Sequence, residues 1–243
     1  QVGQVVDDQI EAKERNSLVS YVDKKAEEIL VNALTPLVPS PGFITEEDTV
    51  DNQRSEYTWI IDPLDGTTNF AAGIPYWAIS VARFVDGRPS EVFLDVPALN
   101  QRFVALRGRG ATRNNQPLTS ETRSLATSAC VSLCSRSIRV LQRQPDQRFP
   151  GKIRLLGVAS LNLVSVAMGQ TIASLEATPK IWDLAAAWLV LDELGCPIRW
   201  LDADPARLSP GEDVADLGFP VLAAGSWAHL ARFLPWGESL VQP

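Results

Sequence analysis

The sequence is poor in histidine and cysteine, the side chains most used in zinc sites and in nucleophilic catalysis. Among 243 residues it has one histidine, His229, and three cysteines, Cys130, Cys134 and Cys196. An odd, sparse set of cysteines without histidine partners indicates reduced thiols, as in a cytoplasmic chain, and argues against a disulfide framework. Because the neighbours of His229 are apolar and resemble a core helix, the sequence disfavours a zinc site, a Ser-His-Asp site and a Cys-His site.

Long apolar runs and blocks of basic residues are missing as well. No stretch is apolar over the length that a membrane-spanning helix needs, and no signal-peptide pattern is visible, so we expect no membrane partner. The 22 Lys and Arg residues are outnumbered by 29 Asp and Glu, which gives a net charge of −7. This charge balance argues against a nucleic-acid partner. An acidic protein that handled phosphate would need a metal ion to offset the repulsion.

The apolar pattern of the remaining residues, 45% of them hydrophobic, predicts a globular chain with mixed helices and strands. Residues 3–15 read as the tail of an amphipathic helix, and a second helix begins at Asp23 with Ala26, Ile29, Leu30 and Leu34 as its apolar face. Three runs between 77 and 106 predict an antiparallel meander. From about residue 128, short apolar runs alternate with helical patterns, as in an α/β unit.

The most informative stretch spans residues 59–70, with the sequence WIIDPLDGTTNF. The apolar start predicts a buried strand, which we expect to stop pairing at Pro63 because proline has no N–H group. Two carboxylates, Asp62 and Asp65, flank this stop, and a divalent cation would relieve their mutual repulsion. Gly66 then precedes a predicted helix start, where free N–H groups can bind an anion. The simple alternative is a pair of turns, Asp-Pro and Asp-Gly.

Further acids occur where predicted strands end or helices begin. Glu46 and Glu47 follow a short predicted strand, although consecutive acids are also common in solvated loops. Asp23 and Asp183 stand at predicted helix starts, where an N-cap is the simple explanation for each. The helix that Asp183 opens is alanine-rich and ends at Gly195. Taken together, these acids suggest a site assembled from distant segments.

Residues 59–70 resemble the signature of the inositol monophosphatase family, whose members are Mg²⁺-dependent, lithium-sensitive phosphatases. The acidic pair at 46 and 47 and the Trp182-Asp183 pair match other pieces of that signature, in order. Thr45 and Cys196 depart from it, each standing where the family commonly has glycine. The resemblance implies that two or three Mg²⁺ ions are held by Glu46, Asp62, the Leu64 carbonyl, Asp65 and Asp183.

The resemblance also implies roles for residues around the metal ions. Thr67, with Glu47 behind it, would orient the attacking water. Asp23 would lie near a third metal position, and Lys13 matches a lysine on a mobile loop that affects metal binding. Residues implied in binding the substrate or its phosphate are Asp65, Gly66, Thr67, Thr68, Gly157, Val158, Ala159, Glu176 and Asp183.

The implied fold is a layered αβαβα sandwich, with an α+β half at residues 1–122 and an α/β half at residues 123–243. The implied activity is hydrolysis of a small sugar or polyol phosphate, first of all inositol 1-phosphate. Histidinol phosphate, fructose 1,6-bisphosphate and adenosine 3′,5′-bisphosphate are alternative substrates. A catalytically silent relative that acts as a binding or regulatory protein is the alternative from another class. Family members are usually homodimers, so the resemblance implies a homodimer here.

Overall fold

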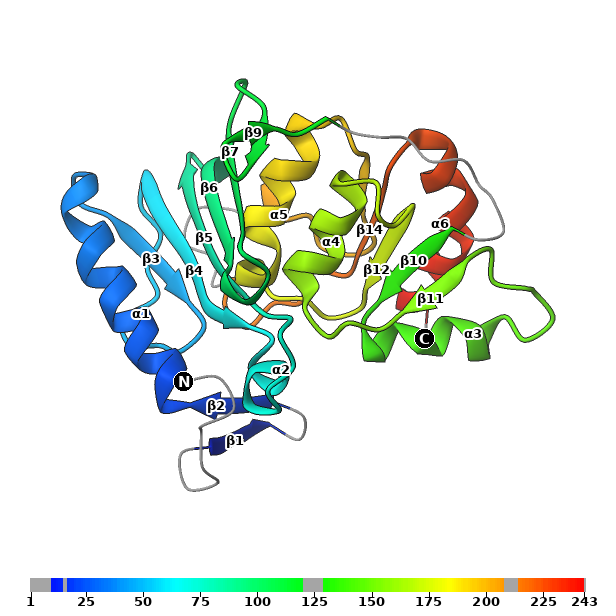
Figure 1. The fold of residues 1–243 in the computed structure, drawn as a ribbon, viewed down its shortest axis with the longest axis horizontal. Coiled ribbons are helices and arrows are strands. Elements are labelled where there is room, and N and C mark those ends of the chain that lie inside the picture. The colour runs from blue at the N-terminus through cyan, green and yellow to red at the C-terminus, as the bar shows by residue number, and fades with distance from the viewer. Residues whose placement is uncertain (1–9, 15–16, 120–128, 208–213, 243) are drawn as a thin grey trace.

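The computed structural model describes residues 10–14, 17–119, 129–207 and 214–242, with side chains described from Tyr21 onward. Two β-sheets and the helices that cover them form most of this structure (Figure 1). The predicted boundary between two halves, at residues 122 and 123, lies outside the described residues. One hydrophobic cluster joins Ile60, Val164 and Ala223, so the two sheets share a core. The division into halves therefore stays a prediction.

The first sheet has seven strands within the described residues, in the order β3-β4-β5-β6-β7-β8-β9. β3 and β4 run parallel, and each later neighbour is antiparallel, as the meander prediction required. The strands are β3 (Gly42–Thr45), β4 (Tyr57–Asp65), β5 (Ala78–Val85), β6 (Arg88–Val96), β7 (Gln101–Leu106), β8 (Ala111–Arg113) and β9 (Gln116–Pro117).

The second sheet has five described strands in the order β11-β10-β12-β14-β13. β10 is parallel to both β11 and β12, whereas β14 is antiparallel to β12 and β13. Parallel neighbours need crossover connections, so the α/β character predicted for this part of the chain is confirmed. The strands are β10 (Cys130–Leu133), β11 (Lys152–Arg154), β12 (Ala173–Glu176), β13 (Ile198–Trp200) and β14 (Val221–Ala224).

The helices and sheets form five layers, which confirms the predicted αβαβα sandwich (Figure 1). α1 covers the outer face of the first sheet, α4 and α5 lie between the sheets, and α3 and α6 cover the second sheet. The helices are α1 (Tyr21–Leu34), α2 (Thr67–Ala71), α3 (Arg139–Arg143), α4 (Ala159–Ala167), α5 (Ile181–Glu193) and α6 (Trp227–Val241). Short 3₁₀ turns are η2 (Thr35–Leu37), η3 (Pro97–Leu99), η4 (Ser135–Ile138) and η5 (Pro205–Arg207).

The central position of α5 follows from its composition. The helix is apolar nearly all round, because alanine, leucine, valine and tryptophan fill every side of its first three turns. A helix of that kind must be covered on both sides. Its small alanines allow close approach to the first sheet, while Trp188 packs edge-to-face against Phe84 of β5 and Trp200 of β13. The N-terminus of α5, where Asp183 lies, is thereby fixed between the two sheets.

One prediction for the N-terminal region was wrong, and a second was right only in part. Residues 10–14 form a strand, β1 (Ile10–Glu14), which pairs antiparallel with β2 (Ser17–Ser20) instead of continuing a helix. The helical pattern there was short, and pairing with a neighbouring strand outweighs so weak a propensity. In α1, Leu30 and Leu34 pack against a hydrophobic cluster as predicted, but Ile29 is 59% exposed, and the buried positions are Asp23, Glu27 and Val31, spaced four apart. α1 thus presents two acids to the first sheet.

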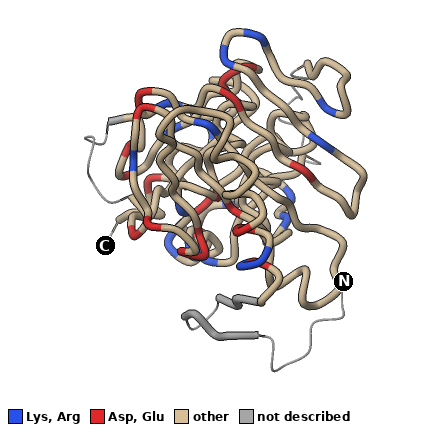
Figure 2. Tube along the Cα trace, turned by 90° about the vertical axis from the view of Figure 1, so that its left-hand side faces the viewer, with Lys and Arg blue, Asp and Glu red and all other residues tan. Residues whose placement is uncertain are grey.

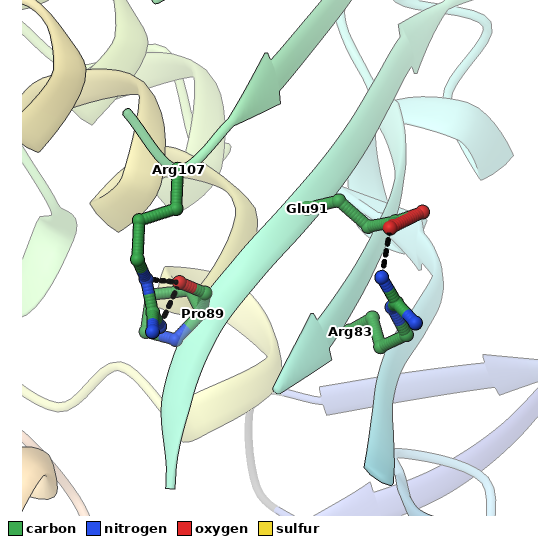
Figure 3. A network of polar contacts seen from close by, with 4 residues as sticks. All are labelled: Arg83, Pro89, Glu91 and Arg107. Atoms are coloured by element: carbon green, nitrogen blue, oxygen red, sulfur yellow. Dashed lines mark hydrogen bonds and ion pairs between the residues drawn. The ribbon is translucent and has the colours of Figure 1, made fainter. Parts of the chain in front are cut away.

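Charged side chains on the surface are scattered, and the pairs between them are modest. Figure 2 shows Lys and Arg distributed over many described segments of the trace. In Figure 3, Arg83 of β5 pairs with Glu91 of β6, and Arg107 donates to the Pro89 carbonyl. Partly exposed ion pairs contribute only about 0–1 kcal/mol, so the sheet depends mainly on its buried face. Among the described residues, no helix has the length and apolarity needed to cross a membrane.

Candidate metal and phosphate site

Three aspartates from distant parts of the chain converge at one point. Asp62 and Asp65 lie at the end of β4, and Asp183 lies in the first turn of α5. One carboxylate oxygen from each lies within 4.8 Å of the others. Asp62 and Asp65 are buried, and Asp183 is half-buried. The structure therefore brings together the central acids that the sequence pattern selected.

An irregularity in β4 lets two acids three residues apart face the same point. In a regular strand, residues i and i+3 point to opposite faces of the sheet. Asp62 pairs with Ser80 and Asp65 pairs with Ala78, so β4 has one more residue than β5 between these two pairs. Such a bulge changes the facing of the residues that follow it. The prediction that the strand stops at Pro63 was wrong, since β4 continues to Asp65, but the register does shift at that proline.

The carboxylates destabilise one another when they are all charged. The pKa of Asp62 lies well above its usual range because of burial first, and then because of the charges of Glu46, Asp65 and Asp183. Burial, followed by the charge of Asp65, raises the pKa of Asp183 to about 7. No N–H group of the described residues reaches Asp62 Oδ2. A buried, oxygen-only, anionic donor set of this kind fits a hard divalent cation such as Mg²⁺, which would remove the repulsion.

Asp183 is held by the helix that it opens. The N-cap of α5 is Lys180, and Asp183 is the third helical residue, so its prediction as the N-cap was wrong by three positions. The Lys180 N–H donates to Asp183 Oδ2 at 2.6 Å. A carboxylate in the first turn is favoured by the helix dipole, and this contact fixes the side chain toward the cluster.

Glu46 and Glu47 follow β3, whose end lies beside the end of β4 because the two strands are parallel. Glu46 is close enough to Asp62 to raise its pKa, and Glu47 is buried. Glu27 of α1 holds this loop. Its Oε2 accepts the Glu47 N–H at 2.8 Å, and its Oε1 accepts both the N–H and the hydroxyl of Thr49 at 2.9 and 2.8 Å.

The sequence analysis missed Glu27. The signal that could have identified it is its spacing of four from Asp23, which places both acids on one side of a helix. Two acids on the buried side of an otherwise amphipathic helix need partners, and here the partners belong to the candidate site.

Thr67 and Asp23 contact one another beside the cluster. Thr67 Oγ1 lies 3.2 Å from Asp23 Oδ2 and 3.1 Å from the Leu64 carbonyl oxygen, and its single proton can serve one acceptor at a time. Asp23 is buried, so α1 contributes to the site directly. Lys13 lies in β1, where the structure describes the backbone only. The structure therefore gives no position for the Lys13 side chain.

The turn after Asp65 is closely packed against the segment that connects β11 to α4. Gly66 has φ +98° and precedes α2, and a Cβ at this position would lie 2.8 Å from Val158 Cγ2. The Ser160 N–H donates to Asp65 Oδ2 at 2.8 Å. Asn69 donates to the Leu156 carbonyl at 2.9 Å. Only glycine fits at position 66, and the segment 156–160 fixes the metal-site turn from the far side.

A pocket of about 650 Å³ opens next to the aspartates and is lined by Asp65, Asp183 and the predicted wall residues Gly157, Val158, Ala159 and Glu176. Its volume is typical of small-molecule sites. Thr67 and Thr68 lie at the start of α2 and are not among the residues that line it. A smaller pocket, of about 440 Å³, lies elsewhere, and none of the three aspartates lines it.

Glu176 forms the polar wall of the larger pocket together with Asn162, which the sequence analysis did not select. Asn162 Nδ2 and Ser174 Oγ donate to Glu176 Oε1 at 3.0 and 3.2 Å. Burial raises the pKa of Glu176 to about 8, so this side chain is an uncharged carboxylic acid at neutral pH. An acid in that form can donate a hydrogen bond to a substrate oxygen.

Cys134 also lines the pocket, a position that the sequence analysis did not assign to it. Its Sγ accepts the Ala177 N–H at 3.3 Å. Burial first, and then the neighbouring Glu176, raises the pKa of the thiol. A thiol that holds its proton is a poor nucleophile. All three cysteines are free, as predicted, and His229 is buried in α6 with its N–H donating to Ser226 Oγ.

Known proteins share both the sequence pattern and the fold. The sequence model of the inositol monophosphatase family matches residues 3–232. The chain is 33% identical over 211 residues to a Pasteurella multocida protein named Nus factor SuhB, which covers 84% of this chain and 79% of that one. It is 32% identical over 223 residues to the inositol-1-monophosphatase of Mesorhizobium japonicum, and the alignment covers 88% of this chain and 83% of that protein. The solved IMPase of Thermotoga maritima has a similar fold, with TM-score 0.82, 24% identity and coverage of 99% and 90%.

Proposed function

The chain belongs to the inositol monophosphatase family, and from this premise we propose that it is a Mg²⁺-dependent phosphomonoesterase acting on a small sugar or polyol phosphate. The observation that carries the proposal is the convergence of Asp62, Asp65 and Asp183, two of which, Asp65 and Asp183, also line a pocket with a polar wall. The similarity to a protein named inositol-1-monophosphatase makes inositol 1-phosphate the first substrate to test. Histidinol phosphate, fructose 1,6-bisphosphate and adenosine 3′,5′-bisphosphate are the alternatives.

The metal-binding set that we propose is Glu46, Asp62, the Leu64 carbonyl, Asp65 and Asp183, holding two or three Mg²⁺ ions. When bound, Mg²⁺ would lower the pKa of a coordinated water and offset negative charge on the phosphoryl group. Ser160 orients Asp65, and Lys180 orients Asp183, through the N–H contacts described above. These contacts reduce the freedom of the ligands before any ion binds.

Thr67 would orient the attacking water. When the Thr67 hydroxyl donates to Asp23, its oxygen keeps lone pairs that can accept a proton of the water. Glu47 would stand behind this pair, on the loop that Glu27 holds. The N–H groups of Gly66 and its two following threonines would hold the phosphate at the start of α2.

The far part of the substrate would rest against the wall of the pocket. Gly157, Val158 and Ala159 would line one side of the sugar or polyol. Glu176 would donate to, and Asn162 would contact, the hydroxyl groups. Attack by water needs no covalent intermediate, which agrees with the protonated state of Cys134.

The test is the Asp65→Asn variant, assayed for phosphate release from inositol 1-phosphate with and without Mg²⁺. We expect the variant to lose nearly all Mg²⁺-dependent activity while its circular dichroism spectrum is unchanged. Asp86→Asn is the matched control, because Asp86 lies in a turn with φ 51°, where asparagine is equally suited. Activity close to wild type in Asp65→Asn would contradict the proposed metal site.

A second candidate function is that of a binding or regulatory protein that lacks catalysis. The observation that favours it is the similarity to a protein named Nus factor SuhB. A wild-type chain that releases no phosphate from any ester in the panel above, with Mg²⁺ present, would support this alternative. A homodimer and a cytoplasmic location remain predictions, and sedimentation velocity would test the first of them.

A further inference from the structure

Arg136 lines the pocket and has no part in the functions considered so far. β10 ends at Leu133, and η4 carries Arg136 into the lining of the pocket that Asp65 and Asp183 also line. Because β10 and β12 are parallel neighbours, the residues that follow them meet at one edge of the sheet. Arg136 Nη1 accordingly donates to the hydroxyl of Thr178 at 2.8 Å.

The Thr178 contact gives the guanidinium a fixed place while most of its donors stay available. A guanidinium has five N–H donors, and the only hydrogen bond from Arg136 to a described residue uses one of them. No carboxylate of the described residues forms an ion pair with it. Arg136 is exposed, so the free donors are open to a ligand.

Contacts between the lining residues connect the aspartates to Arg136 by way of Glu176. Asp65 and Asp183, where a metal ion and the scissile phosphate would sit, lie near enough to Glu176 for their charges to act on its carboxyl. That carboxyl accepts from the amide of Asn162 and acts in turn on the thiol of Cys134. Arg136 follows Cys134 by two residues and donates to Thr178, which follows Glu176 by two residues. Among the described residues that line the pocket, Arg136 is the one cationic side chain. A substrate that matched this order would carry a phosphate, then hydroxyl groups, then a second anion.

We propose that Arg136, placed by Thr178, forms a subsite for a second anionic group, so that the preferred substrates are phosphomonoesters bearing a phosphate or carboxylate at their far end. This inference rests on the phosphatase function proposed above. Arginine binds such groups bidentately, with two parallel N–H···O contacts. The proposal favours a bisphosphate over histidinol phosphate, whose far end carries a cationic amine that Arg136 would repel.

The test compares esters that differ only in the second anion. Fructose 1,6-bisphosphate is paired with fructose 1-phosphate, and 3-phosphoglycerate with glycerol 3-phosphate, and kcat/KM is measured for each with Mg²⁺. We expect wild type to favour the doubly anionic member of at least one pair by tenfold or more. Which pair shows the larger ratio tells whether the group bound is a phosphate or a carboxylate.

The Arg136→Gln variant should reduce that ratio at least fivefold, and Arg136→Lys should retain part of it. A ratio within one preparation cancels differences in the fraction of folded enzyme. Arg109→Gln, on the exposed turn after β7, is the control and should leave the ratio unchanged. Hydrolysis with equal kcat/KM for both members of both pairs, or an unchanged ratio in Arg136→Gln, overturns the role of Arg136. If wild type hydrolyses no ester at all, the phosphatase proposal fails, and this subsite fails with it.

Discussion

Replacing Glu176 with glutamine should make the metal-free protein more stable at neutral and alkaline pH. Glu176 is buried, and burial raises its pKa from 4.5 to about 8. In the unfolded chain the same carboxyl ionises near its ordinary value. Between these two pKa values the folded state binds a proton that the unfolded state has released, so stability falls as pH rises. Glutamine is neutral at every pH and does not impose this loss.

The size of the effect follows from the separation of the two pKa values. Each pKa unit corresponds to about 1.4 kcal/mol, so the penalty in wild type is roughly 3 kcal/mol at pH 7 and between about 4 and 5 kcal/mol at pH 8. Well below pH 4.5, both states are protonated and the penalty disappears. Glutamine keeps the Oε1 acceptor for Asn162 and Ser174, so the network itself is preserved.

The measurement is urea unfolding of wild type and Glu176→Gln in EDTA at pH 5 and pH 8, followed by tryptophan fluorescence. We expect the free energy of unfolding of the variant, relative to wild type, to rise by about 3.5 kcal/mol between these pH values. Glu28→Gln is the control, because Glu28 is exposed and should give a change below about 0.5 kcal/mol. Parallel pH profiles for wild type and Glu176→Gln would refute the reasoning.

Two further predictions concern the metal site. Glu27→Ala removes the acceptor for the N–H groups of Glu47 and Thr49, so it should destabilise the fold by roughly 3 kcal/mol. It should also raise the Mg²⁺ concentration needed for half-maximal activity at least fivefold. Glu27→Gln should have effects of intermediate size. A folded Glu27→Ala protein with a wild-type Mg²⁺ titration would show that the loop needs no such support. Millimolar lithium should inhibit phosphate release, as in the family that the sequence resembles, and full activity in high lithium would argue against a site with three ions.

The parts of the fold that the sequence predicted are those set by local pattern. The apolar run before Asp62, the alanine-rich helix after Asp183 and the turns between residues 77 and 106 each give a strong signal over a few residues. Once these elements are placed, Asp62 and Asp65 lie at the end of β4, next to Asp183 at the start of α5. The five layers follow from how such elements bury their apolar faces.

The features that were missed depend on contacts between distant segments. The bulge at Pro63 exists only relative to the register of β5, and the buried side of α1 is decided by Glu27 meeting the loop at residue 47. The sequence analysis did not select Arg136, because nothing near it in the sequence indicates the pocket. Residues 10–14 pair as a strand for the same reason, since a weak local preference yields to a neighbouring partner.

The hydrogen bond from Ser160 to Asp65 has a consequence for the order in which the protein becomes competent during synthesis. Asp62 and Asp65 leave the ribosome long before Ser160 and Asp183 do. A nascent or truncated chain that ends before α4 therefore has two of the carboxylates but lacks both the third and the Ser160 N–H that orients Asp65. With the metal site proposed above, such a fragment would bind Mg²⁺ poorly, so premature termination or proteolysis would yield inactive products.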